Sequence, residues 1–404
     1  MTTNDESVAS AASGTNSSGR APTALWLLFI VTALMSIGYG LIFTLLADIR
    51  DHFGFTSGGV GLIVFAGFAS GFISQLFLSR YADRGRTVLM VRTGIAVAAF
   101  SMLWMVFATD LWQWIGGRLL FGLGSGMVSP SMRRVVIARD PQQVGMNLGR
   151  QTAFEMGGFL LGPLIAAVLA QTIDLRAPFL FLFITYTAVL ALIGRIDLRS
   201  GPQDVHHRSL RNLIVQPAMQ SALAAAIAFF LTVGMFEAIW AIVLRDLDAP
   251  TWLIGVTLSL FSLPMIFFAS RAGAIAQRRG PIRMVTISIT VAAICTFSYG
   301  IGPLWVLIAV SAIHAIADSF TMPANQVAVA LSSPPEQFAA GQGLLGATGL
   351  AVAGLAALGG SAIYGSHGRS AVFTATAVLM MVFVVIARAR WSTYERRCAI
   401  TAAE

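Results

Sequence analysis

Long apolar stretches alternate with short polar segments along almost the whole chain. A helix that crosses a bilayer needs about 20 mostly apolar residues to span roughly 30 Å of hydrocarbon. Twelve stretches have this length and character. The pattern therefore predicts an all-α membrane protein with 12 transmembrane helices, at residues 23–47, 58–79, 88–109, 111–132, 150–171, 178–195, 218–244, 251–270, 284–301, 304–324, 341–364 and 371–387.

The polar segments between these stretches predict the domain boundaries. Residues 1–22 are rich in Ser, Ala and Thr and lack an apolar block, which predicts a disordered tail. The longest interior polar stretch, 196–217, predicts a linker between two six-helix bundles at 23–195 and 218–387. The polar residues 388–404 predict a second tail on the same side of the membrane.

The two predicted bundles are similar in sequence. Residues 79–84 align with residues 273–278, and Pro130 of the fourth span aligns with Pro323 of the tenth. Parallel repeats of this kind occur in secondary transporters, which bind their substrate near the midplane and rock the halves around it. We therefore expect two pseudo-symmetric bundles.

Composition and charge exclude several classes of protein. Only 11% of the residues are charged, against about 25% in soluble domains, and the mean hydropathy is +0.78. These values exclude a soluble enzyme. The 26 basic residues are all Arg and cluster between apolar stretches, so the net charge of +8 indicates membrane orientation and not nucleic-acid binding. Only Arg50, Arg176, Arg245 and Arg369 fall on the predicted outer side, so both termini are predicted to be cytoplasmic.

The remaining composition narrows the location and the partners. The absence of Lys is typical of a GC-rich coding bias and predicts a bacterial inner membrane. The chain contains no nucleotide-binding glycine loop, HExxH or GxSxG motif, so we expect no enzyme activity, cofactor, metal or nucleotide. We expect a monomer whose partners are the lipid bilayer, protons and a small-molecule substrate.

A motif between the second and third spans carries a family resemblance. Residues 79–86 read SRYADRGR and resemble the Gly-x-x-x-Asp-Arg-x-Gly-Arg signature of the major facilitator superfamily. Ser79 replaces the first Gly, one residue is missing between Arg84 and Gly85, and Gln277 replaces the acid in the second copy. The resemblance covers essentially the whole chain and implies the major facilitator fold, as in 12-helix proton-coupled drug exporters.

The acid of this motif predicts a gating latch. A carboxylate at the inner end of one half can pair with Arg there or cap a helix N-terminus of the other half, which closes the outward-facing state. We predict Asp83 as this latch, with Arg84, Arg86 and Arg278 around it. The alternative is a loop acid that only neutralises neighbouring Arg side chains.

Two further motifs resemble the same family. Arg118 to Gly124 is similar to its buried-arginine motif, which implies a role of Arg118 in proton coupling. Gly158, Gly162 and Pro163 resemble the Gly-x-x-x-Gly-Pro motif of proton-drug exchangers, although the Gly pair that usually follows is Ala-Ala here. Glycines four residues apart let helices approach closely and Pro bends a helix, so packing alone is the alternative explanation.

Ionisable side chains inside the spans are costly and mark candidate functional sites. Arg118 and Glu237 lie at similar predicted depths in opposite halves, so we expect them to attract each other in one conformation. His314 and Asp318 are four residues apart on one helix face, which predicts a proton relay or, alternatively, a structural hydrogen bond. Glu155 is a further candidate, with pairing to a nearby Arg150 as its structural alternative.

These groups and their neighbours suggest what the protein transports. A surplus of acids over Arg118 can hold either protons or a cationic solute, and competition between the two gives antiport. Phe236 and Trp240 flank Glu237 and predict a cavity wall or a cation–π surface, with helix packing as the alternative. The first span contains no acid within its apolar part, so neutral amphipathic substrates remain equally open.

The sequence thus favours a secondary transporter of the multidrug-resistance type. We predict proton-coupled efflux of hydrophobic or cationic small molecules by alternating access. The alternatives are a proton-coupled carrier of sugars or organic acids, a lipid flippase, or a membrane scaffold that does not transport.

Overall fold

A computed structural model describes residues 21–193, 198, 201–204 and 208–401. Every element of regular structure in this part of the chain is helical. The first half contains α1 (Ala21–Phe53), α2 (Ser57–Phe77), α3 (Ser79–Tyr81), η1 (Ala82–Arg86), α4 (Thr87–Phe107), α5 (Leu111–Arg139), η2 (Pro141–Gln143), α6 (Val144–Thr172) and α7 (Ala177–Ile193). The second contains α8 (Leu210–Ile214), α9 (Pro217–Asp246), α10 (Thr251–Arg279), α11 (Pro281–Ile301), α12 (Leu304–Ser332), η3 (Pro335–Gln337) and α13 (Phe338–Thr401).

These helices account for the twelve predicted spans. Ten of them are α1, α2, α4 to α7 and α9 to α12, and α13 supplies two because its backbone breaks at Gly368. Within the described residues, seven helical stretches are long and apolar enough to cross a membrane. Two of these, Gly58–Phe107 and Pro335–Arg396, each contain two spans joined by a tight turn. The predicted all-α membrane fold is confirmed.

Local sequence explains where several helices begin and end. Asp110 and Gln113 form a capping box at the start of α5, which satisfies free amides of its first turn. Pro217 and Pro281 stand in the first turns of α9 and α11, where a missing amide proton costs nothing. Gly368 has φ 78° and ψ −174°, and because glycine tolerates this conformation the chain turns between the two spans of α13.

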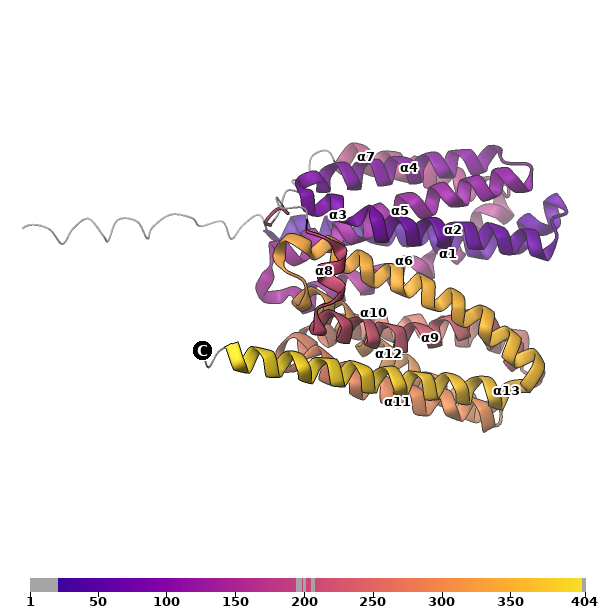
Figure 1. Cartoon of the computed structure of the whole chain (residues 1–404). Helices are drawn as coiled ribbons and strands as arrows, with labels where there is room; N and C mark the ends of the chain where they lie inside the picture. The colour runs from indigo at the N-terminus through magenta and orange to yellow at the C-terminus, as the bar shows by residue number, and fades with distance from the viewer. Residues whose placement is uncertain (1–20, 194–197, 199–200, 205–207, 402–404) are drawn as a thin grey trace, which may run out of the picture.

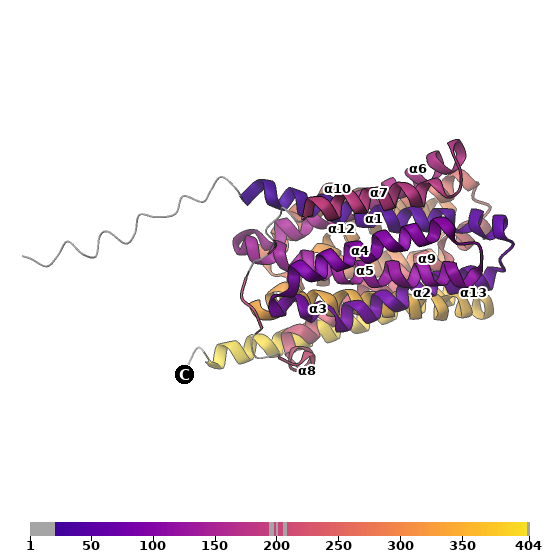
Figure 2. The same ribbon diagram turned by 90° about the horizontal axis from the view of Figure 1, so that it is seen from above.

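The helices form two groups that run along a common axis (Figures 1 and 2). In the first group α1 packs on α6, and α5 packs on α2 and α4; in the second α9 packs on α13, and α12 packs on α10 and α11. Figure 1 shows the first group above the second. Helix α3 and the C-terminus lie at the same end of the molecule (Figure 1). This end is named the Arg-rich end, because the segments that join α3 to α4, α5 to α6 and α10 to α11 carry or adjoin Arg84, Arg86, Arg139 and Arg278.

Contacts between the two groups are closest at the Arg-rich end. There α6 crosses α10, with Gly145 against the backbone of Gly273 and Gly149 against the backbone of Ala269. A β-carbon at any of the glycines would overlap the opposite carbonyl group. Nearby, Gly343 of α13 packs on α2 and α3. Small residues therefore hold the two halves together at this end.

The predicted Gly158, Gly162 and Pro163 motif lies on the face of α6 that contacts α1. Gly158 packs against the backbone of Ala33, and Pro163 lies beside Gly40. The motif thus joins two helices of the same half and not the two halves.

Several predicted boundaries differ from the structure. Helix α5 extends to Arg139 and α6 begins at Val144, beyond the predicted spans 111–132 and 150–171, because both helices continue past the apolar region. The predicted disordered tail 1–22 includes two residues of α1, and its residues 1–20 lie outside the described part. The linker 196–217 contains α8, and the polar tail 388–404 is helical as far as Thr401.

Candidate functional site

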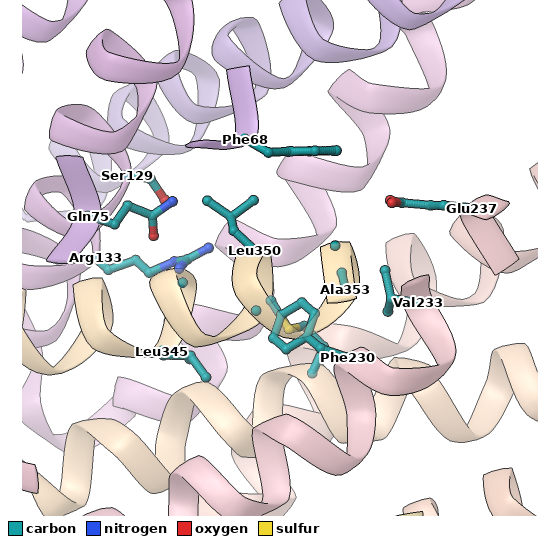
Figure 3. Close-up of a pocket in the computed structure, with 14 residues that line it drawn as sticks. Phe68, Gln75, Ser129, Arg133, Phe230, Val233, Glu237, Leu345, Leu350 and Ala353 are labelled. Carbon is teal, nitrogen blue, oxygen red and sulfur yellow. The ribbon is translucent and has the colours of Figure 1, made fainter. Parts of the chain in front are cut away.

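A cavity of about 200 Å³ lies between the two halves. Helices α2, α5, α9, α12 and α13 contribute its walls (Figure 3). Most lining side chains are apolar, and several glycines of α13 make room for it; the lining residues used below are Phe68, Gln75, Ser129, Arg133, Phe230, Glu237, Met322 and Leu350. The polar members of this lining gather at two places.

Glu237 is the carboxylate of the cavity lining. It lies on α9, is exposed to the cavity, and forms no hydrogen bond or ion pair with any described residue. Figure 3 shows its carboxylate directed into the cavity, on the side of Val233 and Ala353. An acid in such surroundings is stabilised by taking up a proton or by binding a cation.

The other polar place is formed by Gln75, Ser129 and Arg133, here named the polar corner (Figure 3). Ser129 and Arg133 are one helical turn apart on α5, and Gln75 faces them from α2. Arg133 Nη2 donates to both carboxylate oxygens of Glu155 at 3.1 Å, while Arg133 Nε has no partner among the described residues.

Glu155 therefore has a different partner from the one the sequence suggested. Its carboxylate is buried against Arg133, whereas Arg150 donates to Asn147 at 3.3 Å. The structural alternative of a Glu155–Arg150 pair is not formed, because Arg133 of the neighbouring α5 pairs with Glu155. Glu155 is neutralised behind the cavity wall.

Arg118 is fully buried on α5 and lies among aromatic rings. Its guanidinium carbon is 5.5 Å from the ring centroid of Phe43, and the rings of Tyr39 and Phe121 lie within 6.0 Å. None of its three nitrogens has a hydrogen-bond partner in the described part of the chain. The expected attraction to Glu237 is thus not formed in this conformation, and cation–π contacts take its place.

His314 and Asp318 do meet, but away from the cavity. His314 Nε2 lies 3.6 Å from Asp318 Oδ1, and His314 Nδ1 lies 3.0 Å from the Tyr299 hydroxyl on α11. The first separation is longer than a normal hydrogen bond and the second is within its range. The residues form a buried row inside the second half, with Tyr299 as a member that the sequence did not indicate.

Phe236 and Trp240 belong to the same interior and not to the cavity wall. Phe236 packs on Phe261 and His314, and Trp240 is fully buried and donates to Thr257 at 3.0 Å. The prediction of a cavity wall is wrong for both side chains because they point into the packed half, away from the lining of the cavity.

Asp83 connects the two halves at the Arg-rich end. Its carboxylate accepts from Arg134 Nε at 2.9 Å and from the backbone amides of Ala339 and Ala340 at 3.0 and 2.8 Å. These amides open α13, so Asp83 both pairs with Arg and caps a helix N-terminus. Burial raises the pKa of Asp83 to about 7, while the hydrogen bonds from α13 and Arg134 act in the opposite direction.

The basic residues predicted around Asp83 do not pair with its carboxylate in the described structure. The guanidinium groups of Arg84 and Arg86 lie over the Tyr81 ring, 5.4 and 6.0 Å from its centroid. Arg278 is exposed at the end of α10 and has no partner among the described residues. The partner is instead Arg134, which lies 51 positions further along the chain.

The equivalent position of the second half makes a related contact. Gln277 Oε1 accepts from the backbone amide of Gly145 at 2.7 Å, and its Nε2 donates to the carbonyl of Gln142 at 3.1 Å. Gly145 lies in the first turn of α6. Each half thus caps a helix of the other, one with a carboxylate and one with a neutral amide.

A family model described as the Major Facilitator Superfamily matches residues 28–236 and 222–397. The chain belongs to this superfamily. Its members are transporters, so this protein is a multi-pass membrane transporter for small molecules. The two matches together cover nearly all of the described helices.

Proteins named multidrug resistance protein MdtG are similar to this chain over most of its length. The protein from Salmonella arizonae is 25% identical over 362 residues, covering 83% of this chain and 85% of its own length. The protein from Salmonella typhimurium is 26% identical over 366 residues, with the same coverage.

Solved structures of the superfamily share the fold at low sequence identity. The human organic anion transporter MFSD10 (TETRAN) has a TM-score of 0.72 at 14% identity, covering 91% of this chain and 99% of its own. The Escherichia coli fucose:proton symporter FucP has a TM-score of 0.74 at 12% identity, covering 92% and 99%. These likenesses concern the fold alone.

Proposed function

We propose that this protein exports hydrophobic or cationic small molecules in exchange for protons. The observation that carries the proposal is Glu237, an unpaired carboxylate in an apolar cavity between the two halves. An ion without a counter-ion in such a cavity is costly, so the site favours either a proton or a cationic solute. Competition between the two for one carboxylate couples their movements in opposite directions.

The contacts at the Arg-rich end supply the conformational part of the proposal. With the Arg-rich end in the cytoplasm, as the positive-inside rule indicates, Asp83 and Gln277 hold the cytoplasmic end closed and the conformation is outward-facing. Release of both contacts would let the halves rock open toward the cytoplasm, which is alternating access. The proposal includes cytoplasmic termini, a bacterial inner membrane and a monomeric protein.

The buried groups outside the cavity have secondary roles in the proposal. Tyr299, His314 and Asp318 form a row through which a proton can move within the second half. Arg118 carries a charge without an acidic partner and would attract Glu237 in a conformation that brings α5 and α9 together. Both remain proposals about coupling.

The relatives support efflux over the alternatives. The name multidrug resistance protein belongs to relatives at 25% and 26% identity. A sugar carrier would need more hydrogen-bonding side chains than this mostly apolar lining offers, and a lipid flippase a larger cavity than about 200 Å³.

Flux in liposomes tests the proposal. Purified protein is reconstituted with an imposed pH gradient, and uptake of radiolabelled benzyltrimethylammonium and of a neutral aromatic analogue is counted. A pH-sensitive dye inside the liposomes reports the movement of protons. We expect solute movement to follow the gradient and to carry protons in the opposite direction. Glu237→Gln should abolish the response of cation flux to the gradient, whereas Glu395→Gln, an exposed acid near the C-terminus, should retain it. Wild-type flux that ignores the gradient would refute proton coupling.

A further inference from the structure

The cavity has two chemically different ends. Glu237 faces it from α9, and the polar corner of Gln75, Ser129 and Arg133 faces it from α2 and α5 (Figure 3). Between them the wall is apolar and includes Phe68 and Leu350. The established family membership assigns no role to the polar corner.

The polar corner has hydrogen-bond donors to spare. Arg133 is 6% exposed, and its Nε has no partner among the described residues although its Nη2 holds Glu155. The Ser129 hydroxyl has no partner in the described chain and can donate, whereas the unpaired atom of the Gln75 amide is its oxygen, which accepts. Guanidinium and hydroxyl groups donate, and an unmet donor in a buried place is costly.

The charges around the cavity decide which acceptor suits this corner. Arg133 is already neutralised by Glu155, so an anionic group would find no net positive charge there. Glu237 leaves one negative charge in the cavity when it is ionised. A ligand with a single positive charge and a neutral acceptor balances both ends, whereas a zwitterion would leave a surplus negative charge.

We propose that the polar corner is a second recognition subsite, which binds a neutral carbonyl-type acceptor of a monocationic aromatic substrate whose cationic end lies at Glu237. The inference rests on the proposed function, and it narrows the substrate class. A volume of about 200 Å³ accommodates one substituted aromatic ring, since cavities of roughly 150 Å³ hold benzene.

Two ligands of equal charge and shape test the subsite. The first ligand is (4-acetylbenzyl)trimethylammonium. The second is (4-isopropenylbenzyl)trimethylammonium, in which a =CH2 group replaces the carbonyl oxygen. Their dissociation constants are measured by calorimetry on the full-length protein in detergent at pH 8. We expect the acetyl compound to bind about tenfold more tightly, because a charge-assisted hydrogen bond is gained.

Variants assign that preference to the polar corner. The double variant Arg133→Gln with Glu155→Gln removes the pair without leaving a lone charge and should reduce the ratio to about three, the part that Ser129 supplies. Ser129→Ala, which keeps the pair, should reduce it about threefold. Arg150→Gln, which alters an Arg bound to Asn147, should leave the ratio unchanged. Glu237→Gln should weaken both ligands equally.

The outcomes separate the two proposals. Equal binding of both ligands to the wild type would overturn the subsite and leave cation transport standing. Retention of the full preference in the double variant would also overturn it. Failure of both ligands to bind at millimolar concentration would refute the proposed cationic substrate and the subsite together.

Discussion

At the scale of single residues, pairing decides which charges are available for function. Glu155 and Glu237 are both acids inside predicted spans, but only Glu155 has a basic partner, at 3.1 Å. Sequence distance gives no sign of this difference, because Arg133 lies on another helix. The paired carboxylate serves structure, and the cavity acid without a partner is the candidate for chemistry.

The Arg133–Glu155 pair gives a stability prediction at this scale. Glu155→Gln alone should destabilise the protein by about 3 to 5 kcal/mol, because it leaves a buried guanidinium without its counter-ion. The double variant Arg133→Gln with Glu155→Gln should recover most of that loss. Thermal unfolding in detergent measures both, and equal losses in the single and double variants would contradict a coupled pair.

At the scale of helices, two capping contacts hold the Arg-rich end closed. Asp83 caps α13 and pairs with Arg134, while Gln277 caps α6. The polar caps are supported by backbone packing of α6 on α10 through Gly145 and Gly273. Opening this end requires all of these contacts to separate.

Loss of the Asp83 charge should favour the opened state. Asp83→Asn removes the ion pair with Arg134 and weakens the cap on α13, and we expect the ratio of open to closed molecules to rise about tenfold. Double electron–electron resonance measures this ratio from the distance between two spin labels. The labels are attached at Arg92→Cys and Arg283→Cys in a Cys295→Ser and Cys398→Ser background. An unchanged distance distribution would show that Asp83 is not a latch.

The crossing of α6 and α10 offers a steric test with a matched control. Gly145→Ala places a methyl group against the carbonyl of Gly273, so the Arg-rich end should no longer close fully. Gly157→Ala lies on the same helix, where no other atom is within 4 Å of the added carbon, and should have no effect. The same pair of spin labels distinguishes the two, and a normal closed state in Gly145→Ala would contradict the close packing.

At the scale of the whole molecule, the two halves use one architecture with unequal chemistry. The position that is Asp83 in the first half is Gln277 in the second, yet both reach across to a helix N-terminus of the other half. The unpaired cavity acid and the row from Tyr299 to Asp318 both belong to the second half, whereas Arg118 and the polar corner belong to the first. The two halves thus share one arrangement of helices, and the positions at which their sequences differ give each half its own functional side chains.

Because both caps act on one opening motion, their effects should add. Asp83→Asn combined with Gln277→Ala should shift the open-to-closed ratio by the product of the two single shifts, as expected for separate sites that bias the same equilibrium. The double variant is compared with each single variant by the same distance measurement. A shift no larger than that of Asp83→Asn alone would show that Gln277 does not contribute.

The local sequence determined the fold class, the positions of most spans and the repeat. The length of the apolar stretches and the clustering of charges are properties of the linear sequence and do not depend on which helices meet. It also indicated Asp83, since a motif preserves residue type and spacing. Only the tertiary structure decided the partners. Asp83 meets Arg134 and Ala339 at sequence separations of 51 and 256 residues, and such contacts depend on which helix faces meet. The same facing of helices paired Glu155, turned Phe236 and Trp240 into the second half, and left Glu237 alone in the cavity.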